Sequence, residues 1–237
     1  MEQVDMIIGC HIMTDQPAGI VLLNKTCANA GSHGFRIHLQ GKSCHVARPH
    51  QGADAIAMAA RVYNDIQIMR ARELDPFEPV VIGIGEIHGG NANNVVCDHV
   101  MMHGTIRTHR DEMDKLIYRR IEEIAESVAK DMGGSAYVET SKYNPALRND
   151  HTLADWITEA AAKAIGAENV KEKPLSMGAE DFSHYTFHKP GAMFNLGVMP
   201  ADGSYVPLHN GKMMVNEDAL DVTPKVFIQF VLDHMED

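Results

Sequence analysis

In the middle of the chain, the spacing of apolar residues alternates between the period of a strand and the period of a helix. The order of these segments restricts the fold more than any other feature. In residues 33–41, "HGFRIHLQG", Phe35, Ile37 and Leu39 share one face, as in a strand with one wet side. A helix, two strands, a second helix and a last strand follow, over residues 53–72, 80–87, 95–108, 111–132 and 135–140. The order βαββαβ predicts a ferredoxin-like unit, with a four-stranded antiparallel sheet and both helices on one of its faces.

The segments on either side of this unit have a different pattern. Residues 4–10, "VDMIIGC", are an almost continuous apolar run, typical of a strand that is covered on both faces in a parallel sheet. After the unit, a helix is expected from Asp150 to Gly166, a buried strand over 192–198 and a last helix from Thr223-Pro224. The prediction is an α/β fold with a mostly parallel sheet, built from residues 1–30 and 143–237, into which the ferredoxin-like unit of residues 31–142 is inserted.

The composition excludes several classes of protein. The chain has 237 residues and a formal net charge of −11, which argues against nucleic acid or an anionic membrane as partner. No apolar run approaches the ~18 residues of a membrane span, and the acidic start "MEQVD" does not resemble a signal peptide. The four cysteines form no Cys-x-x-Cys pair and fit free thiols, so a cytoplasmic location is expected.

Two histidines stand where an α/β sheet would place ligands. His11 follows the first apolar run, and ligands gather at the carboxyl ends of strands in such sheets. His209, in "YVPLHNGK", lies between the late strand and the last helix. Imidazole is a common ligand for zinc-like ions. With 14 histidines in the chain, each one taken alone is more simply explained as an ordinary polar side chain.

Other polar residues lie in turns and on exposed faces of the inserted unit. His45 and His50 belong to "GKSCHVARPHQGAD", a turn-rich loop between a strand and a helix, which is also explained as a helix entry. Asn94, in "IHGGNANNVV", fits a simple turn equally well. Arg107 faces away from the apolar side of its strand and could bind a carboxylate, or be an ordinary exposed arginine. In "MGAEDF", Glu180 or Asp181 could reach a site or cap a short helix.

Together and in this order, these segments resemble the dinuclear-metal amidohydrolase and aminoacylase family. The branch that they resemble includes hippurate hydrolase, N-acyl-amino-acid amidohydrolases and plant auxin-conjugate hydrolases. The inserted unit falls where that family carries its lid, or dimerisation, domain. The matching runs are "VDMIIGCHI", "GKSCHVARPHQGADAI", "IHGGNANNVV", "GTIRT", "MGAEDFSHY", "PGAMFNLG" and "PLHN".

The resemblance implies a role for each candidate residue. His11 would bind one divalent metal ion and His209 the other, and zinc, manganese, nickel and cobalt all suit imidazole. His45 would reach the active site, often that of the partner subunit, and donate a hydrogen bond to the developing oxyanion. Asn94 and Arg107 would hold the substrate, the arginine by its carboxylate. The implied reaction is metal-dependent cleavage of an N-acyl amino acid or a small dipeptide, in a homodimer formed through the lid.

One departure from the family pattern limits this prediction. A catalytic zinc takes about three protein ligands, and this chain offers one histidine for each metal. The family's "CGHD" histidine motif and later glutamate pair have no match before the lid, and Glu122-Glu123 lies inside a predicted lid helix. We therefore expect a metal site that is incomplete and inactive in this chain alone, with its other ligands in a front half that the chain lacks.

Two other interpretations stay open. The chain could be a non-catalytic binding or dimerisation protein derived from the same family, or an unrelated α/β protein with a ferredoxin-like insert and no metal.

Overall fold

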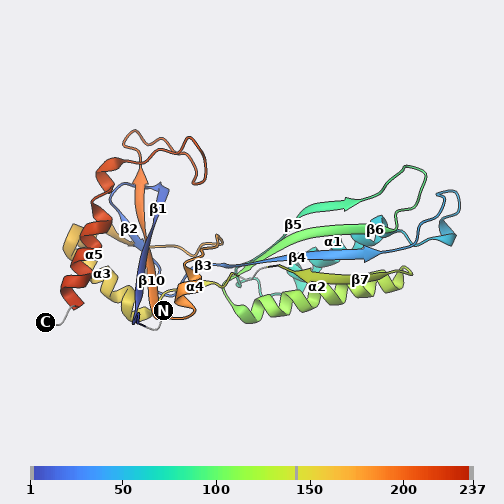
Figure 1. Cartoon of the computed structure of the whole chain (residues 1–237), viewed down its shortest axis with the longest axis horizontal. Helices are drawn as coiled ribbons and strands as arrows, with labels where there is room; N and C mark the ends of the chain where they lie inside the picture. The colour runs from blue at the N-terminus through green and yellow to red at the C-terminus, as the bar shows by residue number, and fades with distance from the viewer. Residues whose placement is uncertain (1–2, 142–143, 235–237) are drawn as a thin grey trace. The chain divides into compact units, whose positions relative to one another are not determined.

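The computed structural model describes residues 3–141 and 144–234, which divide into two compact units (Figure 1). The inserted unit comprises Ala30–Ala146 and Met177–Ala179. The flanking unit comprises Met1–Asn29, Leu147–Ser176 and Glu180–Asp237. A short stretch of the "MGAEDF" motif thus belongs to the inserted unit, although the residues around it belong to the other.

The inserted unit has the predicted βαββαβ order. Its strands pair as β5-β6-β4-β7, and every pair is antiparallel, as in a ferredoxin-like sheet. The elements are β4 (Gly31–Gln40), α1 (Ala55–Arg72), β5 (Val80–Gly89), β6 (His99–Thr108), α2 (Asp111–Asp131) and β7 (Ser135–Thr140).

The core of the inserted unit lies between the helices and one face of the sheet. Phe35, Ile37 and Leu39 of β4 are fully buried there, as their alternation predicts, and helix residues such as Met58 and Ile117 pack against them. Gly104 makes room for the Phe35 ring, because a Cβ at this position would lie 2.3 Å from Phe35 Cζ. The opposite face of the sheet carries the alternate, more polar side chains.

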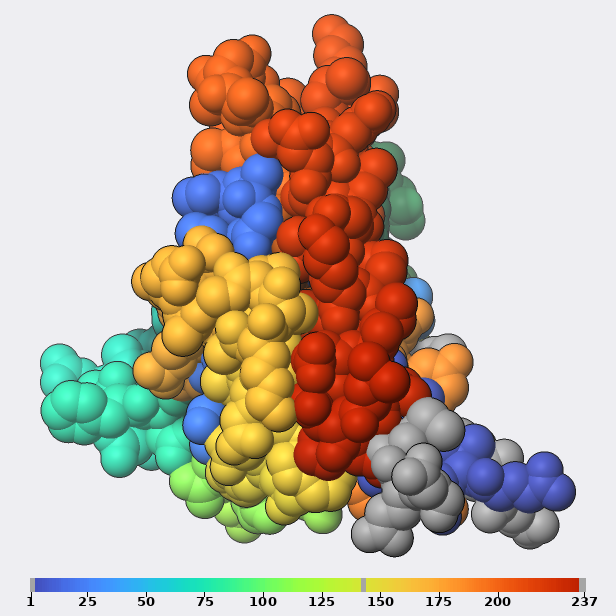
Figure 2. All heavy atoms as spheres, turned by 90° about the vertical axis from the view of Figure 1, so that its left-hand side faces the viewer, coloured from blue at the N-terminus to red at the C-terminus, as the bar shows by residue number. Residues whose placement is uncertain are grey.

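The flanking unit is built on a mixed four-stranded sheet in the order β1-β10-β2-β9. β1 and β10 are parallel, and β10 and β2 are antiparallel. Figure 2 shows α3 in yellow and α5 in red lying side by side. The elements are β1 (Ile7–Pro17), β2 (Val21–Leu23), β3 (Cys27–Asn29), β8 (Leu147–Arg148), α3 (His151–Ile165), β9 (Val170–Glu172), α4 (Ser183–Thr186), β10 (Gly191–Met199) and α5 (Val222–His234).

Three local predictions for the flanking unit were wrong. β1 does not end at Cys10 but continues to Pro17, with an irregular register after Met13, because pairing with β10 extends it. His11 is therefore inside the strand and not past its end. β1 is also only half-buried from Ile7 to Met13, because it is an edge strand. Finally, α5 begins at Val222, ahead of Thr223-Pro224.

The remaining observations concern the whole described chain. None of the cysteines, Cys10, Cys27, Cys44 and Cys97, is in a disulfide bond. Among the described residues, no helix combines the length and the hydropathy needed to cross a membrane.

Candidate functional site

His11 lies on the face of the flanking sheet that is turned away from α3 and α5. Its neighbours Cys10 and Ile12 pack against the core that includes residues of both helices. Successive side chains of a strand point to opposite faces, so Gly9 and His11 share the other face. There, a Cβ on Gly9 would lie 2.8 Å from the ring of Phe182, so the "MGAEDF" segment covers this part of the sheet.

The His11 ring is held in one tautomer. Its Nδ1 lies 2.7 Å from the backbone oxygen of Ile12. A carbonyl oxygen can only accept, so Nδ1 carries the proton and donates it. The Nε2 lone pair is then free, and the half-buried ring is oriented as metal-binding histidines usually are.

Asn195 of β10 is a polar neighbour that sequence reasoning missed. It pairs in register with His11, and its Nδ2 donates to the His11 backbone oxygen at 3.3 Å. The residue is 4% exposed, and no described residue donates a hydrogen bond to its Oδ1. A buried oxygen without a partner is costly, so this atom is available to a bound group. An asparagine inside a buried strand was the signal that could have drawn attention to it.

A buried lysine lies elsewhere in the flanking unit. Lys173 is 5% exposed, and its Nζ donates to Asn29 Oδ1 at 2.9 Å. Burial lowers the pKa of Lys173, and the negative charge of Glu180 acts in the opposite direction. Sequence reasoning gave this lysine no role, because "KEKP" looks like an exposed charged stretch.

His209 lies in the connection between β10 and α5 and has an unusual backbone. Its φ is +66°, in the left-handed region that side chains other than glycine seldom adopt. Such strain collects at functional sites. The connection leaves the carboxyl end of β10, and β1 runs parallel to β10, so both strands end at the same edge of the sheet. His11 lies opposite Asn195, four positions before β10 ends at Met199.

The residues of the flanking unit nevertheless form no complete metal site. Within residues 3–141 and 144–234, no group of three or more histidine, cysteine, aspartate or glutamate side chains is placed to hold a metal ion. His11 and His209 are thus individual candidate ligands, one with a free lone pair and one on a strained backbone.

In the inserted unit, the structure brings His45 and Asn94 together. His45 forms an antiparallel bridge with Val95, and the Val46 amide donates to the Asn94 oxygen at 3.1 Å. The Ala47 amide donates to His45 Nδ1 at 3.1 Å, which makes Nδ1 an acceptor. Nε2 of His45 therefore carries the ring proton and is a hydrogen-bond donor on an exposed loop.

Arg107 lies at the other end of the same sheet. It is opposite Ser32, near the start of β4, whereas the His45 and Asn94 loops lie beyond His99 at the start of β6. Eight residues of strand separate His99 from Arg107, or about 26 Å at ~3.3 Å per residue. Figure 1 shows the two loops together at one end of the sheet. One copy of the inserted unit therefore does not bring His45 and Arg107 to the same ligand.

Comparison with known proteins identifies the inserted region. Residues 27–133 match the family model of the peptidase dimerisation domain. The chain is 35% identical over 222 residues to a probable hydrolase of Synechocystis, covering 93% of this chain and 56% of the relative. It is 32% identical over 235 residues to the N-acetyldiaminopimelate deacetylase of Streptococcus uberis, covering 98% of this chain and 61% of the relative.

Solved structures lead to the same group of enzymes. A putative aminohydrolase from Staphylococcus aureus matches with a TM-score of 0.88 and 26% identity, over 98% of this chain and 60% of that chain. The YxeP protein of Bacillus subtilis, a dinuclear metal-binding peptidase of the M20 family, matches with a TM-score of 0.80 and 25% identity, over 97% and 57%. The fold is thus that of M20 peptidases with dimerisation domains. The chain spans less than two thirds of the length of each of these relatives.

Proposed function

We propose that this chain is part of an M20-family, metal-dependent amide hydrolase that cleaves N-acyl amino acids or small dipeptides. In this proposal, the flanking unit is a portion of the catalytic domain and the inserted unit is the lid. The observation that carries the proposal is the opposite tautomer of two histidines: His11 keeps a free Nε2 lone pair, and His45 keeps an Nε2 proton. A ligand requires the first state, and an oxyanion donor requires the second.

The donor set fits a divalent metal ion. His11 would bind one ion and His209 the other, and the partnerless Oδ1 of Asn195 lies on the strand beside His11. When bound, a pair of such ions would polarise the carbonyl and lower the pKa of water. Two histidines are fewer than the site needs, so its other ligands and the general base would come from polypeptide outside this sequence. The chain alone is then expected to be inactive.

The inserted unit would supply the groups that bind the substrate. His45 would donate its Nε2 proton to the carbonyl oxygen as negative charge develops, beside Asn94. Arg107 would bind the substrate carboxylate in a planar, two-pronged arrangement. Since these groups lie at opposite ends of one sheet, we propose a composite site, with His45 from one subunit and Arg107 from its partner.

A homodimer through the inserted unit follows from the composite site. The match to a dimerisation domain supports it, and so does the distribution of apolar surface. Helix α1 exposes Ile56 at 52% and Ile68 at 58%, and the neighbouring edge strand β5 exposes Ile87 at 53%. Sedimentation should show a dimer, and Ile68→Glu should convert it to a monomer. Tyr137→Glu, at an exposed residue of the opposite edge strand, is the matched control that should stay dimeric.

Metal titration of the purified chain tests the ligand assignment. We expect weak binding of Zn²⁺ or Mn²⁺ by calorimetry, lost in His11→Ala and retained in His151→Ala, an exposed histidine of the same unit. Equal binding by both variants would refute the role of His11. Tight binding of two ions by the chain alone would show that the site is complete without further ligands.

Kinetics of the assembled enzyme test the lid residues. His45→Ala should lose about 2.7–4 kcal/mol of transition-state stabilisation, the size of one oxyanion donor. Arg107→Ala should chiefly raise KM, whereas Arg36→Ala, an exposed arginine on the same face of the sheet, should not. A fall in kcat at constant KM would contradict a carboxylate-binding role for Arg107.

A non-catalytic dimerisation protein is the second candidate, and the match over residues 27–133 favours it to the same degree. It predicts a dimer without metal binding, so the metal titration separates the two. The free thiols support a reducing compartment, and we place the protein in the cytoplasm on that ground.

A further inference from the structure

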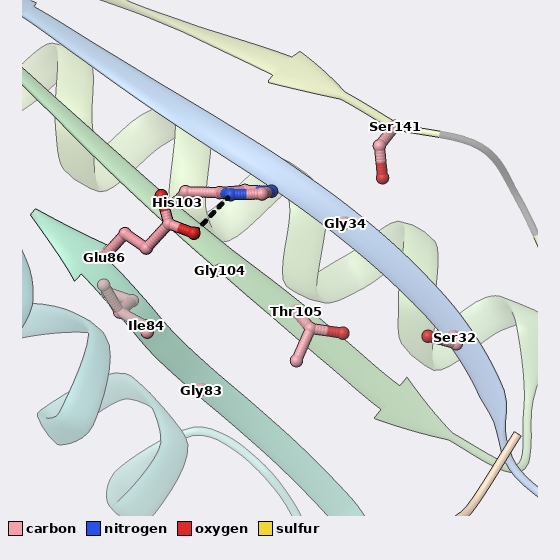
Figure 3. A pocket seen from close by; sticks show the side chains of 10 residues that line it. Ser32, Gly34, Gly83, Ile84, Glu86, His103, Gly104, Thr105 and Ser141 are labelled. Atoms are coloured by element: carbon pink, nitrogen blue, oxygen red, sulfur yellow. Dashed lines mark ion pairs between the residues drawn. The ribbon is translucent and has the colours of Figure 1, made fainter. Parts of the chain in front are cut away.

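The open face of the inserted sheet contains a hollow of about 520 Å³ (Figure 3). It lies on the side that faces away from the core and its helices, over the start of β4 and the middle of β5 and β6. Its walls carry both hydroxyl groups and charge, so it is unlike a simple gap between apolar side chains. The lining residues are Ser32, Gly34, Gly83, Ile84, Gly85, Glu86, His103, Gly104, Thr105 and Ser141.

Glycines create this hollow, although packing does not require all of them. A Cβ on Gly83 would meet nothing closer than Thr105 Cγ2 at 3.9 Å, and a Cβ on Gly85 would meet nothing within 4 Å. Glycine inside a strand weakens it, and it often marks a place where a ligand approaches the backbone closely. Larger residues would fit at both positions, so the packing of the sheet does not require glycine at either of them.

One end of the hollow is negatively charged. The ladder between β5 and β6 is irregular between Ile84 and Glu86, and beyond this point Glu86 pairs with His103. Glu86 Oε2 lies 3.1 Å from His88 Nε2, and Oε1 lies 3.7 Å from His103 Nδ1. The hydrogen bond from His88 keeps the pKa of Glu86 below its ordinary value. Among the ten lining residues, Glu86 alone carries a formal charge at neutral pH.

The other end of the hollow leads towards Arg107. Thr105 lines the hollow, and Arg107 is two residues further on the same face of β6. The four residues from His103 to Arg107 span about 13 Å. Ser32 pairs with Arg107, and Ser32 and Ser141 place hydroxyl groups at the same end of the hollow (Figure 3).

We propose that this hollow selects ligands with an ammonium group, which Glu86 binds, at a short distance from the carboxylate that Arg107 binds. The substrate class would be N-acyl amino acids with a cationic side chain, whose methylene groups lie over the glycine backbone. This inference rests on the proposed function for the Arg107 end, but the Glu86 end can be tested by itself. His88 and His103 orient the carboxylate, and an ammonium group would add a third donor to it.

Two probes of the same length separate charge from shape. Nα-acetyl-L-lysine carries the ammonium group, and Nα-acetyl-L-2-aminoheptanoic acid replaces it with a methyl group. In ¹H–¹⁵N spectra of the 237-residue chain, the lysine probe should shift the amides of Gly83, Gly85 and Thr105. Its affinity should exceed that of the aminoheptanoate probe about fivefold, the scale of one exposed ion pair.

Matched variants locate the effect. Glu86→Gln should remove the fivefold preference, whereas Glu139→Gln should keep it. Glu139 is exposed to the same extent, 53% against 54%, and also lies beside a histidine. Gly83→Val should fill the hollow and abolish binding while the thermal stability stays equal or rises, because valine favours strands.

The outcomes distinguish this inference from the proposed function. Equal affinity for both probes, or shifts outside the hollow, would overturn the role of Glu86. If Arg107→Ala then still weakened both probes, the carboxylate-binding role in the proposed function would stand. If Arg107→Ala changed neither probe while Glu86→Gln removed the preference, the ammonium site would stand and the proposed role of Arg107 would fail.

Discussion

The inserted unit and the flanking unit differ in the size of their buried cores. In the inserted unit, one cluster of 22 buried residues lies between the sheet and its helices, and α2 exposes no large apolar side chain among its described residues, although α1 exposes Ile56 and Ile68. The corresponding cluster of the flanking unit has 15 buried residues. In the flanking unit, α5 exposes Ile228 at 59%, Val231 at 45% and Leu232 at 68%. β1 is half-buried and pairs only with β10 among the described strands.

This difference indicates which structural features stabilise each unit. The inserted unit is formed mainly by one continuous stretch of chain, which contains a whole core. The flanking unit is assembled from three separate stretches. Its edge strand β1 and the exposed apolar residues of α5 are surfaces on which further polypeptide can pack, as are β5 and α1 of the inserted unit. We therefore expect a core substitution in the inserted unit to lower that unit's free energy of unfolding by much more than an edge-strand substitution lowers that of the flanking unit.

The largest expected effect comes from the core of the inserted unit. Phe35→Ala should lower the free energy of unfolding of that unit by about 3–5 kcal/mol, since it empties a fully buried site. Ile8→Ala, on half-buried β1, should lower that of the flanking unit by about 1 kcal/mol. Urea unfolding measures both, with circular dichroism for the whole chain and tryptophan fluorescence for the flanking unit.

Trp156 makes this assignment possible. It is the only tryptophan of the sequence, and its ring stacks on His234 at 4.1 Å within the flanking unit. Phe35→Ala should leave the fluorescence midpoint in place while the circular dichroism transition moves. A joint shift of both signals would mean that the units unfold together, and the comparison between them would lose its basis.

A loss of stability of intermediate size is expected for the inserted unit at alkaline pH. Burial, assisted by the negative charge of Asp114, raises the pKa of Tyr118 to about 12. The folded unit therefore keeps a proton that the unfolded chain releases near pH 10, so this stabilisation is present below pH 10 and is lost between pH 10 and 12. Allowing for solvent screening, the loss should be about 1–2 kcal/mol. Urea unfolding at several pH values measures it.

Tyr118→Phe is the variant that isolates this effect. At pH 7 it should cost about 1 kcal/mol, because the Tyr118 hydroxyl donates to the Gly34 oxygen at 2.7 Å. Between pH 10 and 12 its further loss should be smaller than that of the unchanged chain. Tyr137→Phe, at an exposed position of the same sheet, should behave like the unchanged chain. An equal alkaline loss in all three proteins would exclude Tyr118 as its source.

The sequence was informative where structure is decided locally. The alternation of Phe35, Ile37 and Leu39 and the helical spacing that follows identify the ferredoxin-like order, because each element has one buried face. The sequence did not predict strand segments that form only because they pair with another strand. The polar residues before Pro17 look like a turn but extend β1, and the two- and three-residue strands β3, β8 and β9 are too short to show a period.

The candidate site divides in the same way. The loop that holds His45 and the turn that holds Asn94 stood out by composition, and the bridge between His45 and Val95 brings them together. The positive φ of His209 has no signature in sequence, and the only sequence signal for the partnerless oxygen of Asn195 is an asparagine inside a buried strand. The hollow beside Glu86 also could not be predicted, because it depends on the register of β5 and β6 and on the irregularity between them.

The smallest effect is one that should be equal in the two units. Asp54 caps α1 of the inserted unit and accepts from the amides of Ile56 and Ala57, and Asp150 caps α3 of the flanking unit and accepts from the amide of Leu153. Replacing either aspartate by alanine should cost its own unit about 1 kcal/mol. Urea unfolding measures each unit, with tryptophan fluorescence for Asp150→Ala and circular dichroism for Asp54→Ala.

Asp54→Ala and Asp150→Ala should lower the free energy of unfolding of their units by the same amount, and this equality is the most stringent test of the comparison. A cap acts within one helical turn, so it does not depend on whether the rest of the unit is covered. If the units differ only in the size of their buried cores, the core and edge substitutions should separate them and the cap substitutions should not. A cost for Asp150→Ala several times that for Asp54→Ala would mean that the flanking unit is weak throughout, and that the size of its core is not the cause.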